Sequence, residues 1–354
     1  MRWFLGLLLV IAVVLGAAYA VGRFLLPNTL EVTRSVTVER PRSAVFAMVN
    51  DLRIAKEWSP FYARDPDADY VFSGDPGEGQ NMRWTSDVRD IGAGRMSIVR
   101  STNLEEVESI LEMGDRATLT SRLMLRPSDE GSSVNWTMSA QCAEGSINVP
   151  CRYMNLVMRG RIEAELDSGL ARLKTLAEQL PNVDFEGFEI TAVPVEPQDV
   201  LFVDVTIASD RPTFADRSAA ETDGIGALNN FIASTDGQVS RPDQLVRVFP
   251  SENGQNGLYR FSVGYPYTGA APPRLVGVRT GRTPGGAALR LEYQGRRSEL
   301  PRMYRVLDAY MQAHRISARP ATEAWEIVRA PTAGAEGGTA EDPIEHAEIY
   351  FPIE

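Results

Sequence analysis

The first apolar segment of the chain is an uninterrupted run from Trp3 to Val21, with Arg2 before it and Arg23 after it. A helix of that length rises about 28 Å, close to the roughly 30 Å thickness of the hydrocarbon core of a bilayer. The pattern therefore predicts one membrane-inserted segment within residues 1–27. It leaves two alternatives, an uncleaved anchor and a signal peptide cleaved after Ala18-Tyr19-Ala20. The run exceeds the usual signal core of roughly 7–15 residues, which favours the anchor.

Residues Glu31–Glu39 alternate between apolar and polar positions with period two, which predicts a strand, and several more strand candidates follow before residue 140. The first strand, Glu31–Glu39, precedes a short helix that Ser43 can cap, and a loop follows at Trp58–Phe61. Glycine- or proline-marked turns separate the remaining strand candidates, which are Met82–Val88, Gly94–Arg100, Glu105–Met113, Ala117–Leu125 and Ser133–Ala140.

One continuous apolar stripe closes this region. Its members, spaced three or four residues apart, are Ile162, Leu166, Leu170, Leu173, Leu176 and Leu180. This spacing predicts a long amphipathic helix that Pro181 ends. With the strands before it, the helix outlines a first domain at residues 31–181.

The second half of the chain, residues 184–354, repeats one plan. An apolar-striped helix is predicted at 225–233 and again at Met303–Ala313. Ser240-Arg241-Pro242 recurs 78 positions later as Ala318-Arg319-Pro320. A short strand follows each, at Leu245–Pro250 and Trp325–Val328, and each copy ends in an aromatic strand that contains proline, at Tyr259–Tyr267 and Glu348–Ile353. The order strand, helix, strand, strand in both copies predicts a sheet-backed cleft at a pseudo-two-fold axis.

The short strand of the second copy carries an acid that the first copy lacks. At the 78-residue offset, Val248 corresponds to Glu326, an acid within an apolar run. An unpaired carboxylate is costly to bury, so Glu326 either takes up a proton with a raised pKa or attracts a cation. The alternative is an ion pair with a nearby arginine on a solvated strand.

Charge and cysteine content exclude several classes of function. The formal net charge is −11 and the pI about 4.9, which argues against binding to a phosphate backbone. The only cysteines, Cys142 and Cys151, can form a disulfide outside the cytoplasm or remain free thiols. Because no CxxC motif is present and His314 and His346 are the only histidines, we expect no metal site and no cofactor.

Residues 31–181 resemble the START-like or SRPBCC (polyketide cyclase/dehydrase-like) proteins. The segments that carry this resemblance are Val36–Pro41, Val45-Phe46, Trp58–Phe61, Ser73–Gly77, Asn135–Met138 and Gly169–Lys174. The resemblance implies a helix-grip fold that holds an apolar ligand between its sheet and its long helix. It identifies no catalytic residue. Trp58, Trp84 and Trp136 are expected to be core residues that could also line a cavity.

Residues 184–354 resemble the gyrase-inhibitor-like (GyrI-like) domain, which is also the effector-binding module of some AraC-type regulators. The segments that carry this resemblance are Leu291–Gly295, Leu300, Tyr304, Trp325–Val328, Pro331 and Ile349–Ile353. Arg297 stands where the family often has an aromatic residue. The resemblance implies that Glu326 lies in an aromatic pocket, with Tyr293, Tyr304 and Tyr350 as candidate wall residues.

The fold class expected for the whole chain is therefore α+β, a helix-grip domain and a duplicated β-α-β-β domain behind one transmembrane helix. The favoured function is a membrane-anchored protein that binds hydrophobic, including lipophilic cationic, small molecules, with one pocket per domain. The alternatives are a hydrolase with Glu326 as general base or acid, and an inhibitor-like module that docks an unknown protein partner. Because a short N-terminal end usually remains in the cytoplasm, the soluble domains are expected in the periplasm or outside the cell.

Overall fold

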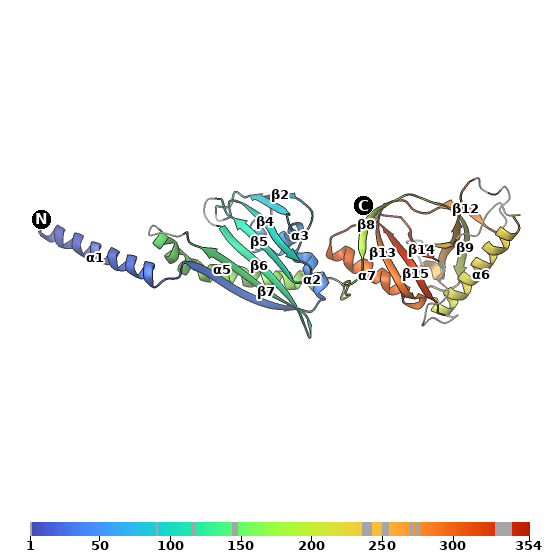
Figure 1. Cartoon of the computed structure of the whole chain (residues 1–354), viewed down its shortest axis with the longest axis horizontal. Coiled ribbons are helices and arrows are strands. Elements are labelled where there is room, and N and C mark those ends of the chain that lie inside the picture. Colours follow the sequence, from blue (N-terminus) through green and yellow to red (C-terminus); the bar gives the residue numbers. More distant parts are fainter. Residues whose placement is uncertain are drawn as a thin grey trace. The chain divides into compact units, whose positions relative to one another are not determined.

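The structure is a computed structural model that describes residues 2–89, 91–114, 118–143, 148–235, 243–249, 255–269, 272, 277–329 and 342–354. By their internal contacts the residues fall into two compact units, Met1–Asp184 and Phe185–Glu354 (Figure 1). Each unit is built on its own antiparallel sheet.

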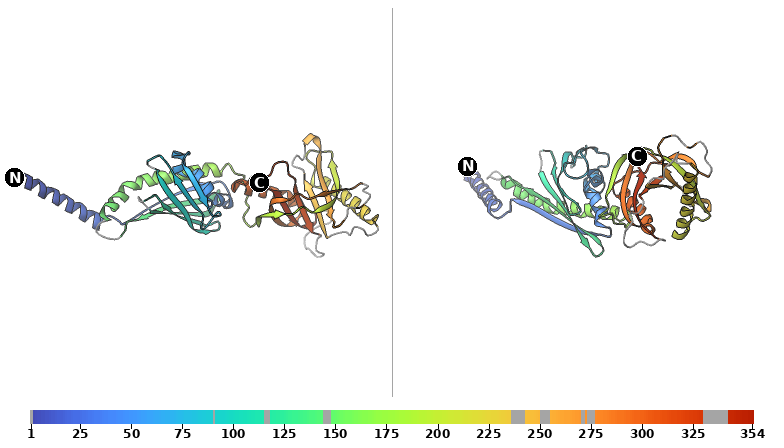
Figure 2. Two further views of the ribbon diagram at one scale, coloured as in Figure 1. Left: turned by 90° about the horizontal axis from the view of Figure 1, so that it is seen from above. Right: turned by 45° about the vertical axis from the view of Figure 1, so that its right-hand side comes forward.

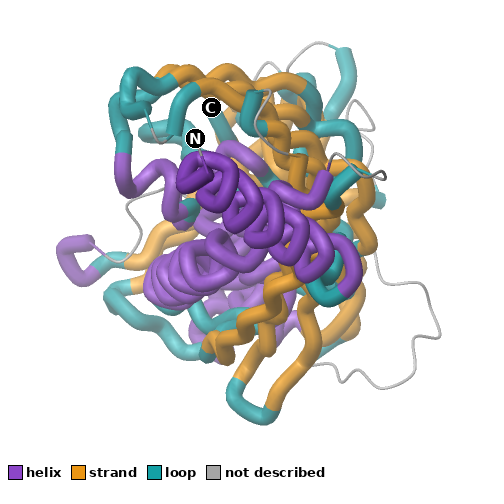
Figure 3. The backbone as a smooth tube through the Cα atoms, turned by 90° about the vertical axis from the view of Figure 1, so that its left-hand side faces the viewer, coloured by secondary structure: helices purple, strands orange, loops and turns teal. Residues whose placement is uncertain are grey.

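The first unit begins with helix α1 and continues into a seven-stranded sheet of order β1-β7-β6-β5-β4-β3-β2. Its elements are α1 (Arg2–Phe24), β1 (Thr29–Val38), α2 (Arg42–Val49), α3 (Leu52–Trp58), α4 (Pro60–Arg64), β2 (Asp69–Ser73), β3 (Asn81–Thr85), β4 (Ala93–Thr102), β5 (Glu106–Glu112), β6 (Thr118–Ser128), β7 (Gly131–Gln141) and α5 (Val149–Ala177). None of the apolar stretch of α1 is buried, and this helix is the foremost element in Figure 3.

Helix α5 packs the predicted apolar stripe against the sheet (Figure 2). Leu166, Leu170 and Leu173 are almost completely buried. At Gly169 the helix backbone comes so close to the sheet that an added Cβ atom would lie 2.6 Å from the ring of Trp136. The long helix and curved sheet therefore form one core, as the helix-grip prediction for this part of the chain required.

Two local predictions for the first unit were wrong, and one strand was not predicted. Trp58–Phe61 is not a loop, because it contributes to helices α3 and α4. Strand β2, at the sheet edge, alternates between exposed and half-buried residues and was not predicted. Ser43 does not cap α2: Pro41 is the N-cap residue, and the Ser43 hydroxyl donates a hydrogen bond to Asp184 instead (2.6 Å).

The second unit is an eight-stranded sheet of order β12-β9-β11-β10-β14-β15-β13-β8 with two long helices. Its elements are β8 (Ile190–Val195), β9 (Asp199–Ile207), α6 (Phe214–Ala233), β10 (Gln244–Phe249), the short helix η2 (Gln255–Gly257), β11 (Tyr259–Pro266), β12 (Arg279–Arg282), β13 (Gly286–Arg296), the short helix η3 (Arg297–Glu299), α7 (Leu300–Ala313), β14 (Ala324–Arg329) and β15 (Ile344–Pro352). The order strand, helix, strand, strand occurs as β9-α6-β10-β11 and as β13-α7-β14-β15. The first copy of the predicted turn repeat, Ser240-Arg241-Pro242, lies outside the described residues.

The register of the two central strands shows which residue of the first copy lies beside Glu326. Strands β10 and β14 pair antiparallel, with Val248 opposite Trp325 and Arg247 opposite Glu326. Val248 and Trp325 belong to a core cluster on one face of the sheet. Since successive side chains of a strand alternate between faces, Arg247 and Glu326 face the other way. The residue that faces Glu326 across the centre of the sheet is therefore an arginine.

Candidate functional site

The second unit contains a cavity of about 450 Å³ on the face of the sheet that carries Arg247 and Glu326. This volume is in the range of pockets for small-molecule ligands. Helix α6 supplies one wall, helix α7 the opposite wall, and β10, β11 and β14 the floor. Its apolar and aromatic lining consists of Phe214, Phe249, Tyr259, Phe261, Leu300, Pro301, Ala324 and Phe351.

Five charged side chains, Glu221, Arg247, Arg297, Glu326 and Glu345, form what we call the charge cluster. Arg247 is its centre and is only 3% exposed. Its guanidinium donates to Glu221 (2.9 Å), to Glu326 (3.0 Å) and, through two nitrogens, to Glu345 (2.8 and 2.6 Å). Arg297 forms a second ion pair with Glu221. Four of the five, Glu221, Arg247, Arg297 and Glu326, line the cavity, whereas Glu345 does not.

Glu326 uses both carboxylate oxygens within this cluster. Oε2 accepts from Arg247, and Oε1 accepts a hydrogen bond from the Tyr304 hydroxyl (2.9 Å). Burial raises the pKa of Glu326, and the opposing effects of Arg247 and Tyr304 offset this only in part. Burial and the charge of Glu326 also raise the pKa of Tyr304 well above its usual value.

The pKa values of the two arginines are shifted in opposite directions. Burial alone would lower the pKa of Arg247, but the neighbouring carboxylates outweigh it and its pKa is raised well above the usual value. Burial, followed by repulsion from Arg247, lowers the pKa of Arg297. With three carboxylates and two guanidinium groups, the cluster carries one excess negative charge when every member is ionised.

The four residues predicted to bind ligand do not all meet at the cavity. Glu326 and Tyr304 line it and contact each other. Tyr293 lies on β13, where its hydroxyl donates to the Arg296 carbonyl (2.9 Å), and burial raises its pKa to about 12. Tyr350 lies on the opposite face of the sheet, stacked on Trp325 with 5.0 Å between ring centroids.

Four members of the charge cluster were missed by sequence reasoning: Glu221, Arg247, Arg297 and Glu345. The signal for two of them was present, because Arg247 and Glu345 interrupt the apolar positions of strands, as Glu326 does. Glu221 had no such signal, since a charged residue on a helix is usually on its solvated side. Arg297 differs from the aromatic residue that the GyrI-like family often has there, which gives no indication of an ion pair with Glu221.

The first unit contains a cavity of about 710 Å³ between α5 and the sheet. Most of its lining is apolar and comes from both layers: Leu111, Met113, Leu119, Trp136 and Met138 from the sheet, and Met154, Met158, Ile162 and Leu166 from α5. Trp58 and Trp84 are core residues beside a much smaller void of about 50 Å³. The first unit thus has a large apolar cavity in the place that the helix-grip resemblance implied.

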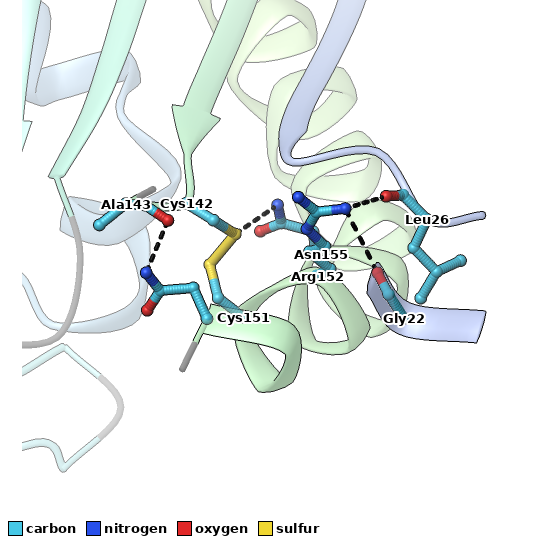
Figure 4. Close-up of a disulfide and its surroundings, with 8 residues drawn as sticks. Gly22, Leu26, Cys142, Ala143, Cys151, Arg152 and Asn155 are labelled. Atoms are coloured by element: carbon cyan, nitrogen blue, oxygen red, sulfur yellow. Dashed lines mark hydrogen bonds between the residues drawn. A yellow bond between two sulfur atoms is a disulfide. The ribbon is translucent and has the colours of Figure 1, made fainter. Parts of the chain in front are cut away.

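The N-terminal end of α5 is connected to the end of β7 and to the end of α1 (Figure 4). The Cys142–Cys151 disulfide connects it to the end of β7. Arg152 donates to the carbonyls of Arg23 (2.8 Å) and Leu26 (2.9 Å) at the end of α1. The Tyr153 hydroxyl donates to the Ala18 carbonyl (2.7 Å).

No described group of three or more His, Cys, Asp and Glu side chains is arranged to hold a metal ion. The candidate sites are therefore assigned from their cavities and their charges alone.

Comparison with known proteins finds a family model that matches most of the first unit. Residues 29–178 match the family described as "Polyketide cyclase / dehydrase and lipid transport". No relative was found among curated proteins.

Three of the solved structures that resemble the chain each cover less than half of it. Protein CV1439 of Chromobacterium violaceum is 14% identical and covers 43% of this chain and 99% of its own, with a TM-score of 0.32. An uncharacterized protein of Rhizobium leguminosarum is 12% identical over 43% of this chain and 95% of its own, with a TM-score of 0.33. Protein Ms6760 of Mycobacterium smegmatis is 18% identical over 42% and 90%, with a TM-score of 0.29. Residues 29–178 are thus an SRPBCC-like domain that matches the polyketide cyclase / dehydrase and lipid transport family.

Proposed function

We propose that this protein is a membrane-anchored binding protein for hydrophobic small molecules, with one ligand cavity in each unit. The observation that carries the proposal is the cavity of about 710 Å³ between α5 and the sheet, in a domain whose family description includes lipid transport. Its apolar walls favour a ligand that is driven in by the hydrophobic effect.

For the second unit we propose a GyrI-like ligand-binding domain that arose by duplication of strand, helix, strand, strand. The repeated element order and the sheet order, in which β9-β11-β10 meets β14-β15-β13, support this. The aromatic lining and the excess carboxylate of the charge cluster favour a lipophilic molecule that is neutral or cationic.

The anchor and the disulfide support an extracytoplasmic position for both units. Helix Trp3–Phe24 is long and apolar enough to cross a bilayer. Disulfides such as Cys142–Cys151 persist in oxidising compartments and are rare in the cytosol. We therefore propose a single-pass protein with residues 29–354 in the periplasm or outside the cell.

A hydrolase centred on Glu326 has less support than binding. Both oxygens of that carboxylate already accept hydrogen bonds, one from Arg247 and one from Tyr304. A water that Glu326 activates as general base would have to share an oxygen with one of these donors. A protein-docking role for the cleft has no specific observation in its favour.

Native mass spectrometry of the full-length protein released from detergent tests the binding proposal. We expect co-purifying small molecules, whose number falls when Met158→Trp fills the first cavity. Val71→Trp, at an exposed position of strand β2, is the matched control and should keep them. An empty wild-type protein that also shows no thermal shift with fatty acids or lipophilic amines would rule out the proposed function.

Glu326→Gln distinguishes ligand binding in the second cavity from ligand binding in the first. The substitution removes the excess charge of the cluster, so a shift caused by lipophilic amines should be lost while a shift caused by fatty acids stays. Steady consumption of a bound compound by the wild type, abolished in Glu326→Gln, would instead support the hydrolase.

A further inference from the structure

The cavity of the first unit reaches the surface beside the end of α1. Four of its exposed lining residues, Gln141, Ala143, Pro150 and Met154, lie at the disulfide end of the cavity, where β7 stops and α5 begins. Met154 both lines the cavity and is 58% exposed. We call this end of the cavity the mouth.

Close packing holds the mouth against α1. A Cβ atom on Gly22 would lie 2.3 Å from Val149 and 2.7 Å from Tyr153, so only glycine allows this approach of the two helices. Arg152 supplies donors to the carbonyls at the C-terminal end of α1, which otherwise have no partner within the helix. The contact is thus both tight and hydrogen-bonded.

The chain between α1 and the sheet is too short to move the mouth far from a bilayer. Only Leu25–Asn28 separate the end of α1 from β1, and four residues span at most about 14 Å. A membrane that contains the apolar part of α1 would therefore end next to the first turns of α5, where Arg23 marks the interface.

An unpartnered apolar patch continues from this contact along α5. Leu156 and Val157 are 61% and 74% exposed, and with Met154 they lie within about 6 Å of Tyr153 along the helix axis. Exposed apolar clusters of this kind mark membrane or protein contacts. Because this patch is continuous with the α1 contact, we infer that it contacts the bilayer that holds α1.

We propose that the mouth opens onto the surface of the anchoring bilayer and that the cavity takes up an acyl-chain lipid directly from it. This inference rests on the proposed function, because it requires that the first cavity binds a hydrophobic ligand. Each methylene of an acyl chain is unfavourable in water, so a mouth at the interface removes the aqueous step from loading. The disulfide, which joins the two elements that border the mouth, keeps this entrance formed.

Photo-crosslinking in vesicles tests the proposal. Full-length protein is reconstituted into phosphatidylcholine vesicles that contain a phosphatidylcholine with a diazirine on its acyl chain, and adducts are located by mass spectrometry after irradiation. We expect adducts at Met154 on the mouth and at Met158 inside the cavity. Adducts confined to α1 would overturn the proposal.

Two matched pairs of variants sharpen the test. Leu156→Lys with Val157→Lys removes the apolar contact and should lower the Met158 adduct about tenfold, whereas Val71→Lys, equally exposed but on β2, should leave it unchanged. Gly22→Leu should separate α1 from α5 and lower the same adduct, whereas Gly16→Leu, with nothing near its Cβ position, should not. Equal labelling in all four variants would contradict the proposed mouth.

A second delivery route distinguishes failure of this inference from failure of the proposed function. A diazirine fatty acid is added to the same variants in detergent, where no bilayer limits access. Labelling of Met158 by the fatty acid, without labelling by the vesicle lipid, would reject the mouth and retain the binding cavity. No labelling by either route would reject both.

Discussion

Arg247 is the residue on which the buried charges of the second unit depend. Its side chain is the only one that contacts Glu221, Glu326 and Glu345 together in the described structure. Removing one partner of a buried ion pair is costly because the remaining charges stay desolvated. A buried arginine with three carboxylates therefore adds little net stability, but each of these charges depends on the others to offset the cost of its burial.

Arg247→Met should destabilise the second unit by about 3–5 kcal/mol, because three carboxylates then lack their main partner. The matched control is Arg329→Met in the same sheet, whose pair with Glu348 is half exposed and should contribute less than about 1 kcal/mol. Calorimetric unfolding of both variants measures the difference. Equal losses would mean that the charge cluster is not held together by Arg247.

Glu326 should make the second unit less stable as the pH rises. Its pKa is raised in the folded state, so above the ordinary value of 4.5 the folded protein holds a proton that the unfolded chain has lost. Folding then binds protons, and stability declines with increasing pH through the raised pKa. Glu326→Gln keeps the side chain neutral, so its stability relative to the wild type should increase from pH 4.5 upward, as measured by urea unfolding at a series of pH values. A difference that does not change with pH would contradict the raised pKa.

At the scale of elements, the packing of helix α5 against its neighbours depends on the positions of its glycines. Gly169 sits against Trp136 and Pro60, while Gly160 has nothing within 4 Å of its Cβ position. The same residue type therefore has a packing role at one place and only a conformational cost at the other.

Gly169→Ala should destabilise the first unit by about 1–3 kcal/mol, because the methyl group would overlap a fixed indole ring. Gly160→Ala should stabilise it by about 0.5–1 kcal/mol, because alanine loses less backbone entropy in a helix. Thermal unfolding of the two variants gives the comparison. Stabilisation by both would show that α5 can move away from the sheet at Gly169.

Elements with a clear periodicity could be predicted from sequence. The stripe on α5 and the alternation in β1 and β7 followed from the spacing of apolar residues. Helices α3 and α4 and strand β2 could not be predicted, because each has only five to seven residues, too few for a clear periodicity. The N-terminal half of α6, which carries Glu221, was missed because it has few apolar residues and so no apolar stripe.

At the scale of the whole molecule, the disulfide bears both on the stability of the first unit and on the cellular compartment in which that unit lies. It joins the sheet to α5 across a short loop, with a sequence separation of 9. A loop of that size corresponds to about 2–3 kcal/mol of stabilisation in the chain-entropy model.

Replacing Cys142 and Cys151 together by serine should lower the stability of the first unit by about 2–3 kcal/mol. Reduced wild-type protein serves as the control and should unfold with the double variant. In intact cells, alkylation before and after reduction measures the state of the two thiols. Free thiols in the native membrane fraction would contradict an extracytoplasmic position for this unit.

Local sequence was enough to determine the apolar N-terminal helix, the long helix of the first unit and the acidic charge that disfavours nucleic acid. These features depend on residues that are neighbours along the chain or along one helix face. The partners of Glu326 were decided only by the tertiary structure, because Glu221, Arg247 and Glu345 come from separate elements. The face on which each strand residue points was decided there too, since a one-residue change in register reverses it, as the pairing of Arg247 with Glu326 shows.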